Sequence, residues 1–225
     1  MMLRQDLVSI LLLTLKTASV ATVCMMVPAT LLGYTLARRD FRGKNLVSAL
    51  VGLPLVLPPT AVGFLLLRLF AVDGPLGRHS LGFDLGLLLS WRAAALAAAV
   101  MSFPLVVRTA KVTFEGINPR LEMMAKTLGH STLATFFRYT LPLARRGLLT
   151  GLILGFTRAL GEFGATVTIA GNIPGRTQTL SAAIFSAQQL GDTDRAYALM
   201  LLALGLGFIA ILSAELLSRA PRSTL

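Results

Sequence analysis

Long apolar runs separated by short polar segments dominate the chain. Five runs reach the roughly 20 residues that an α-helix needs to cross a bilayer. They lie at about 7–36, 46–71, 85–110, 146–171 and 195–218. The first run is long enough for a tilted helix but too short for two crossings. The pattern predicts an all-α membrane protein with about five transmembrane helices, and a sixth if 178–190 re-enters the membrane.

Two adjacent prolines interrupt the second run. Pro58 and Pro59 lack a backbone N–H and should break or kink the helix. The carbonyls freed by such a break must face a partner or a water-filled cavity. Two interpretations stay open: a kink alone, or a break at which Pro58, Pro59 and Thr60 line a transport path and form a hinge.

The composition agrees with a membrane location. Hydrophobic residues make up 55% of the chain and the mean hydropathy is +0.74, more than a soluble domain of this length covers with polar surface. The first run is expected to stay as a span, because Arg4 is its one early positive charge and it is longer than a signal-peptide core. Cys24, the single cysteine, is expected to be a small buried apolar residue without a disulfide.

The net charge of +11 would suit a nucleic-acid-binding protein, so the placement of the basic residues decides its meaning. One side of the predicted spans holds Arg38, Arg39, Arg42, Lys44, Arg108, Lys111, Arg120, Lys126, Arg138, Arg145, Arg146, Arg219 and Arg222. The other side holds Arg4, Arg78, Arg176 and Arg195, with Arg68 and Arg92 near span ends. The positive-inside rule then puts the N-terminus outside and the C-terminus in the cytoplasm. The charge is a topology signal and argues against nucleic acid as a partner.

Motifs for catalysis or metal binding are absent from the sequence. There is no GxxxxGK[ST] phosphate loop, so any ATP hydrolysis must come from a partner, and there is no HExxH or CxxC. His79 and His130 stand alone and are expected to be solvated surface residues. We therefore expect no metal site and no cofactor on this chain, and an enzyme has little support.

The longest cytoplasmic segment, about 112–145, is predicted to form two short helices. Asn118 can cap the first helix, with Pro119 at its first position and Gly129 at its end. The second helix begins at Ser131 and continues until Pro142 redirects the chain into the fourth run. The apolar residues that share a face of the first helix are Leu121, Met124, Ala125 and Leu128, and those of the second are Leu133, Phe136, Phe137 and Tyr139.

The apolar face of this segment needs a covering. The charges around it hold it in the cytoplasm, so the face either packs under its own helices or enters a groove on a partner. The second alternative is favoured.

The residues of this segment resemble a family motif. The run MMAKTLG at 123–129 is followed, nine residues after Gly129, by Tyr139-Thr140-Leu141-Pro142. This is similar to the EAA loop of ABC importer permeases, EAAxxxG followed by IxLP, although Met123 replaces the glutamate and Tyr139 the aliphatic residue. The resemblance implies a coupling loop that docks on an ATPase subunit through Glu122, Met123, Met124, Ala125, Leu128, Gly129, Leu141 and Pro142.

The resemblance extends over nearly the whole chain. The segments GLPLVLPPTAVGFLLL at 52–67, SFPLVVRTAK at 102–111 and GFTRALGEFGATVTIAGNIPGRTQT at 155–179 resemble the molybdate-type branch of these permeases. The resemblance implies that residues 1–225 form one permease domain with the type I importer fold. It also implies that two copies form a homodimer that imports molybdate by alternating access. Its partners would be two ATPase subunits, which carry ATP and Mg, and a periplasmic or lipid-anchored binding protein. Sulfate, tungstate or thiosulfate are the alternative solutes.

Two charges lie within the fourth run. A charge within a bilayer costs about 2.5–3.5 kcal/mol, so Arg158 and Glu162, four residues apart, require an explanation. They either form a self-neutralising ion pair or face a central cavity where Arg158 meets an oxyanion. Thr166, four residues after Glu162 and expected on the same helical face, completes the predicted gate. An ion-coupled carrier that uses this pair as a relay is disfavoured, because no internal repeat is evident.

The outer segment 171–179 is rich in turn-forming residues. It is either a plain connection between spans or the place where a binding protein docks. Asn172 and Arg176 are the residues predicted for that docking.

Overall fold

A computed structural model describes residues 2–218; Arg219 and Arg222 of the predicted cytoplasmic cluster lie outside the described residues. The described residues form helices joined by loops, without strands. In chain order the elements are α1 (Met2–Arg38), α2 (Lys44–Val56), α3 (Pro59–Phe70), α4 (Arg78–Leu81), α5 (Trp91–Glu115), α6 (Pro119–Thr127), α7 (Thr132–Thr135), the π-helical turn η1 (Phe136–Thr140), α8 (Leu141–Leu160), α9 (Gly164–Ala170), α10 (Leu180–Gln189) and α11 (Thr193–Ser218).

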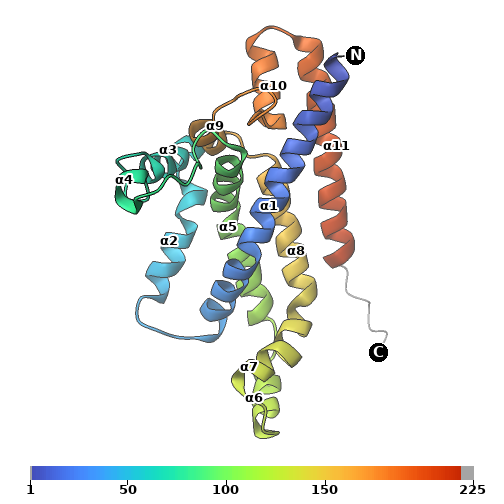
Figure 1. Cartoon of the computed structure of the whole chain (residues 1–225). Coiled ribbons are helices and arrows are strands. Elements are labelled where there is room, and N and C mark those ends of the chain that lie inside the picture. The colour runs from blue at the N-terminus through green and yellow to red at the C-terminus, as the bar shows by residue number, and fades with distance from the viewer. Residues whose placement is uncertain (1, 219–225) are drawn as a thin grey trace.

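The long helices α1, α5 and α8 pack against one another at the centre of the molecule (Figure 1). Small residues along α5 permit this close packing, because Ala93, Ala97, Ala98 and Ala110 are fully or almost fully buried. Helix α11 packs on α8 and α10, and α3 packs on α9. Helices α6 and α7 lie at one end of the molecule and α10 lies at the other (Figure 1).

Three helices, α1, α5 and α11, are long and apolar enough to cross a membrane. Two further spans result if each of two bent pairs counts as one: α2 with α3, bent by 112°, and α8 with α9, bent by 62°. The break predicted at Pro58 and Pro59 is confirmed, since α2 ends at Val56 and α3 begins at Pro59. The segment 178–190 contains the ten-residue helix α10, about 15 Å long and too short to cross.

Much of the apolar surface of this single chain is uncovered. Only 11% of the most apolar window of α11 is buried within the chain, as befits a helix that faces lipid or another membrane helix. The prediction for Cys24 is wrong for the same reason: this cysteine lies on an exposed face of α1. An apolar run of a membrane helix can point outward, because hydrocarbon replaces the protein core around it.

Candidate functional site

The breaks of the two bent pairs touch each other. A Cβ atom added at Gly164, the first residue of α9, would lie 2.9 Å from Pro59 Cβ and 3.3 Å from Thr60 N. A Cβ added at Gly63 would lie 2.7 Å from the Ala165 carbonyl oxygen. Only glycine at these two positions allows α3 and α9 to approach this closely. The structure thus brings Pro59 and Thr60, two of the predicted path residues, next to the segment that carries Glu162.

Glu162 holds the break between α8 and α9 together. Its Oε2 atom lies 2.7 Å from Arg158 Nη1, and its Oε1 accepts a hydrogen bond of 2.9 Å from Ala165 N, which satisfies a free donor in the first turn of α9. Glu162 is 3% exposed, whereas the Arg158 side chain is 33% exposed. The ion pair, one of the two alternatives that the sequence left open, therefore forms, and the carboxylate has a second role in capping that the sequence pattern did not indicate.

The prediction that Glu162 and Thr166 share a helical face is wrong. Helix α8 ends at Leu160 and α9 starts at Gly164, so no continuous helix connects the two residues. Both are buried within the chain, while Pro58, Pro59 and Thr60 are exposed. The predicted gate therefore divides into an exposed group at the proline break and a buried group that supports it.

The predicted coupling loop is ordered by local backbone chemistry. The Asn118 side chain accepts from Arg120 N and caps α6, with Pro119 at the first helical position, as predicted. Gly129 has a φ of +85° and ends the helix. Its N–H donates to Lys126 O and His130 N–H donates to Ala125 O, the pair of bonds that closes a helix through a left-handed residue. Ser131 caps α7 through Ala134 N.

Pro142 does not redirect the chain, in contrast to the prediction. The helical path continues from Thr132 through η1 into α8, and Leu141 N–H donates to Phe136 O. A proline near the start of α8 lacks a donor and would clash within a regular helix. The wider π turn directly before it provides the space.

The outward side of the coupling loop is apolar. The exposed fractions are 61% for Met124, 77% for Leu128, 72% for Leu133 and 61% for Phe137. Of the predicted docking residues, Ala125 is buried, and Glu122 points into the chain towards Arg38 and Thr140. Tyr139, which replaces the aliphatic residue of the motif, has its hydroxyl 3.0 Å from His130 Nε2 and thereby closes the loop on itself.

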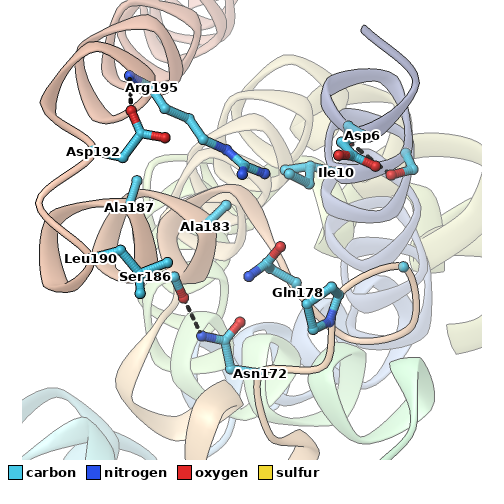
Figure 2. A pocket seen from close by; sticks show the side chains of 13 residues that line it. Asp6, Ile10, Asn172, Gln178, Ala183, Ser186, Ala187, Leu190, Asp192 and Arg195 are labelled. Atoms are coloured by element: carbon cyan, nitrogen blue, oxygen red, sulfur yellow. Dashed lines mark hydrogen bonds between the residues drawn. The ribbon is translucent and has the colours of Figure 1, made fainter. Parts of the chain in front are cut away.

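A pocket of about 340 Å³, lined by both polar and apolar residues, lies at the opposite end of the molecule (Figure 2). This outer pocket is lined by Asp6, Ser9, Ile10, Asn172, Pro174, Gly175, Gln178, Ala183, Ser186, Ala187, Leu190, Asp192 and Arg195. Asn172 is among the lining residues, and Arg176 is exposed outside the pocket; the docking role of these two residues stays a prediction. Sequence patterns did not indicate Gln178 or Arg195 as pocket residues. The pocket is formed by α1 together with α10, α11 and the loop 171–179 before α10, and α1 is far from the others in the sequence.

Two polar groups of the outer pocket are available to a ligand or partner. Asn172 Nδ2 donates to Ser186 Oγ at 2.7 Å, but the buried Asn172 Oδ1 has no hydrogen-bond partner among residues 2–218. The Arg195 guanidinium extends across the pocket (Figure 2) and forms no ion pair with another described residue. A ligand or partner group that offers both a donor and an acceptor would satisfy these atoms.

The fold matches a known class of membrane transporter. A chain of a bacterial ABC transporter involved in the import of the acidic polysaccharide alginate superimposes with a TM-score of 0.72 and 18% identity, covering 98% of this chain and 80% of that one. The protein thus shares the fold of that transporter chain. The chain belongs to the family of binding-protein-dependent transport system inner membrane components, whose model matches residues 29–223.

Relatives with more similar sequences are permease proteins of molybdenum and sulfate transport systems. A molybdenum transport system permease protein of Haemophilus influenzae is 43% identical over 199 residues, which cover 88% of this chain and 87% of the relative. A sulfate transport system permease protein of Salmonella typhimurium is 38% identical over 200 residues, which cover 89% of this chain and 72% of the relative.

Proposed function

We propose that this protein is the membrane-spanning subunit of an ATP-driven importer of molybdate in the bacterial inner membrane. Two copies would form the path, each coupling loop would sit on one ATPase subunit, and a binding protein would deliver the anion from outside. The similarity to molybdenum permeases at 43% identity supports molybdate, and the sulfate permease at 38% identity makes sulfate the second candidate.

The exposed apolar face of the coupling loop is the observation that carries this proposal. Large side chains such as Leu128, 77% exposed, and Leu133, 72% exposed, lie next to the basic residues of the predicted cytoplasmic side. Neither water nor the hydrocarbon core suits such a face at this position, so a groove on a soluble partner is its natural environment. An ATPase partner also supplies the energy for which this sequence has no phosphate-binding motif.

The topology follows from five spans, each bent pair being one crossing. The N-terminus then lies outside and the coupling loop and C-terminus lie in the cytoplasm. Alternating access requires that the path opens to one side at a time, and the two touching helix breaks are suited to this movement. They are the points at which the backbone of the spans is interrupted and can pivot.

The function is tested by reconstituting the permease in liposomes with its ATPase and comparing molybdate-loaded with sulfate-loaded binding protein. We expect molybdate alone to stimulate ATP hydrolysis. Stimulation by sulfate would support the proposal that the protein belongs to an ATP-driven importer but would identify sulfate as a transported anion. Failure to form any complex with an ATPase would contradict the proposal itself.

We infer that the binding protein docks at the outer pocket, through Arg195. Replacing Arg195 with glutamine should raise the concentration of binding protein needed for half-maximal stimulation by at least about tenfold, because a charge-assisted hydrogen bond contributes roughly 1.5–3 kcal/mol. The measurement is a titration of ATPase activity with loaded binding protein. Arg176→Gln is the matched control: it removes the same charge from an exposed position outside the pocket. Equal effects of both variants would contradict a specific role of the pocket.

A further inference from the structure

A single carboxylate oxygen of α6 connects this helix to α1 and to the π-helical turn η1. Glu122 Oε1 accepts from Arg38 Nε at 3.1 Å and from the Thr140 hydroxyl at 3.1 Å, and Arg38 Nη2 donates to the Ile117 carbonyl at 2.8 Å. Arg38 is the last residue of α1, and Thr140 directly precedes α8. We call Arg38, Glu122, Thr140 and the Ile117 carbonyl the inner joint.

The inner joint is enclosed by protein. The side chains of Arg38 and Glu122 are 12% and 14% exposed, and Thr140 is buried. Hydrogen bonds between charged groups are strong, and they are stronger in a site shielded from water than on an exposed surface. One turn before Arg38, the Tyr34 ring packs edge-on against Phe114 and Phe136, at centroid distances of 5.2 and 4.8 Å. The end of α1 is thus fixed to the base of the coupling loop by polar and aromatic contacts.

Apart from the inner joint, helix α6 packs mainly on η1 and α7, the elements that follow it in the chain. Among its residues, all of which the structure describes, only Glu122 and Ala125 are not exposed. Ala125 offers a methyl group, which makes contact without direction, whereas Glu122 makes directional bonds to Arg38 and Thr140. A movement of α6 therefore reaches α1 through the inner joint, whereas the packing of α6 on η1 and α7 leads to α8.

Helix α1 connects the inner joint with the outer pocket. It runs as one helix from Met2 to Arg38, about 55 Å long at 1.5 Å per residue. Near its outer end, the buried Thr14 hydroxyl accepts a hydrogen bond of 2.8 Å from Leu180 N, the first residue of α10. Asp6, Ser9 and Ile10 of the same helix line the outer pocket. Helix α1 is thus bonded to α6 at its last residue, Arg38, and to α10 at Thr14, in its outer half.

We propose that α1 transmits the displacement of the coupling loop to the outer pocket, with Arg38 and Thr140 as the positioning residues of this transfer. Closure of the ATPase subunits moves α6, Glu122 draws Arg38 with it, and α1 shifts α10 through the Thr14–Leu180 bond. Because coupling between two sites is reciprocal, a binding protein seated at the outer pocket biases α6 by the same route. The inference rests on the proposed function, since it requires the ATPase and the binding protein.

The test uses the complete transporter in liposomes with Arg38→Gln and Thr140→Val. Both variants should form the complex and keep basal ATPase activity, but stimulation by molybdate-loaded binding protein should fall by about tenfold for Arg38→Gln, a typical coupling between sites, and less for Thr140→Val. Asp40→Asn is the matched control. Asp40 lies two residues after Arg38 and pairs with Lys44 at 2.8 Å, but its side chain is 98% exposed. The control therefore removes an ion pair that is not part of the inner joint.

A distance measurement separates transmission from simple support of the loop. Spin labels at Ser9→Cys, placed in a Cys24→Ser background, report the separation of the two copies of α1 at the outer end. We expect this separation to change on ATP binding in the parent transporter and to stay constant in Arg38→Gln. An unchanged response in Arg38→Gln, or a loss of stimulation that only follows a loss of assembled complex, overturns the inference. An unstimulated parent transporter overturns the proposed function instead.

Discussion

Replacing Glu162 with alanine is expected to abolish molybdate uptake and to lower the amount of folded protein in the membrane severalfold. The change leaves Arg158 without its partner at 2.7 Å and removes the acceptor for Ala165 N at the start of α9. Removing one partner of a fully buried ion pair costs about 3–5 kcal/mol. The Arg158 side chain is 33% exposed, so the cost here lies below that range but is still a large part of the stability of a domain. Uptake assays and quantitative immunoblots of membranes measure the two effects.

Two further variants decide what the ion pair does. In Arg158→Gln/Glu162→Gln both charges are absent, so protein levels should recover. Uptake should stay low, because the partly exposed guanidinium of Arg158 is the group that we expect to meet the anion. Uptake at the parent rate would show that the pair has a structural role alone. Glu115→Gln is the control with the same spacing: its pair with Lys111, at 3.7 Å, is partly solvated and should contribute little.

Replacing Gly129 with valine is expected to reduce uptake more than tenfold. Gly129 has a φ of +85°, where an L-residue costs roughly 1–2 kcal/mol and a β-branched residue more. No atom lies within 4 Å of the position that its Cβ would occupy, so the effect is one of backbone conformation and not of a clash. The strain is relieved when the end of α6 unwinds, which displaces Leu128 from the apolar docking face.

Asparagine at position 129 is the matched variant, because asparagine tolerates the left-handed conformation better than valine. It should retain most of the uptake, whereas valine should lose binding of the ATPase in a pull-down from detergent. Equal activity of the two variants would contradict the requirement for a left-handed residue. An ion-coupled carrier would respond to neither change, since it has no use for a docking loop.

The comparison of sequence and structure is most instructive at the two helix breaks. The break at Pro58 and Pro59 was predictable, because proline lacks a donor and acts through its own covalent structure. The break between α8 and α9 was not, because no proline lies there: a carboxylate four residues after Arg158 caps α9, and Gly164 packs on Pro59. That second break depends on a contact with a segment about one hundred residues away.

The coupling loop shows the same division. The caps at Asn118 and Ser131 and the end of α6 at Gly129 were predictable, since each is a local hydrogen-bonding or φ preference. Pro142 misled the prediction, because the π turn before it adjusts to the proline without a change of direction. The inward orientation of Glu122 was also not predictable, because its partner Arg38 lies 84 residues earlier in the chain.

The sequence alone determined the membrane location, the apolar runs, the proline break, the helix caps and the family. Each of these depends on a property that adjacent residues carry by themselves, such as hydropathy, a missing N–H or a shared motif. Only the tertiary structure decided which side chains meet: the contact of Pro59 with Gly164, the inner joint, the outer pocket and the exposed face of Cys24. Hydrophobicity drives helices into a bilayer without specifying their partners, so those contacts depend on how side chains from distant segments fit together.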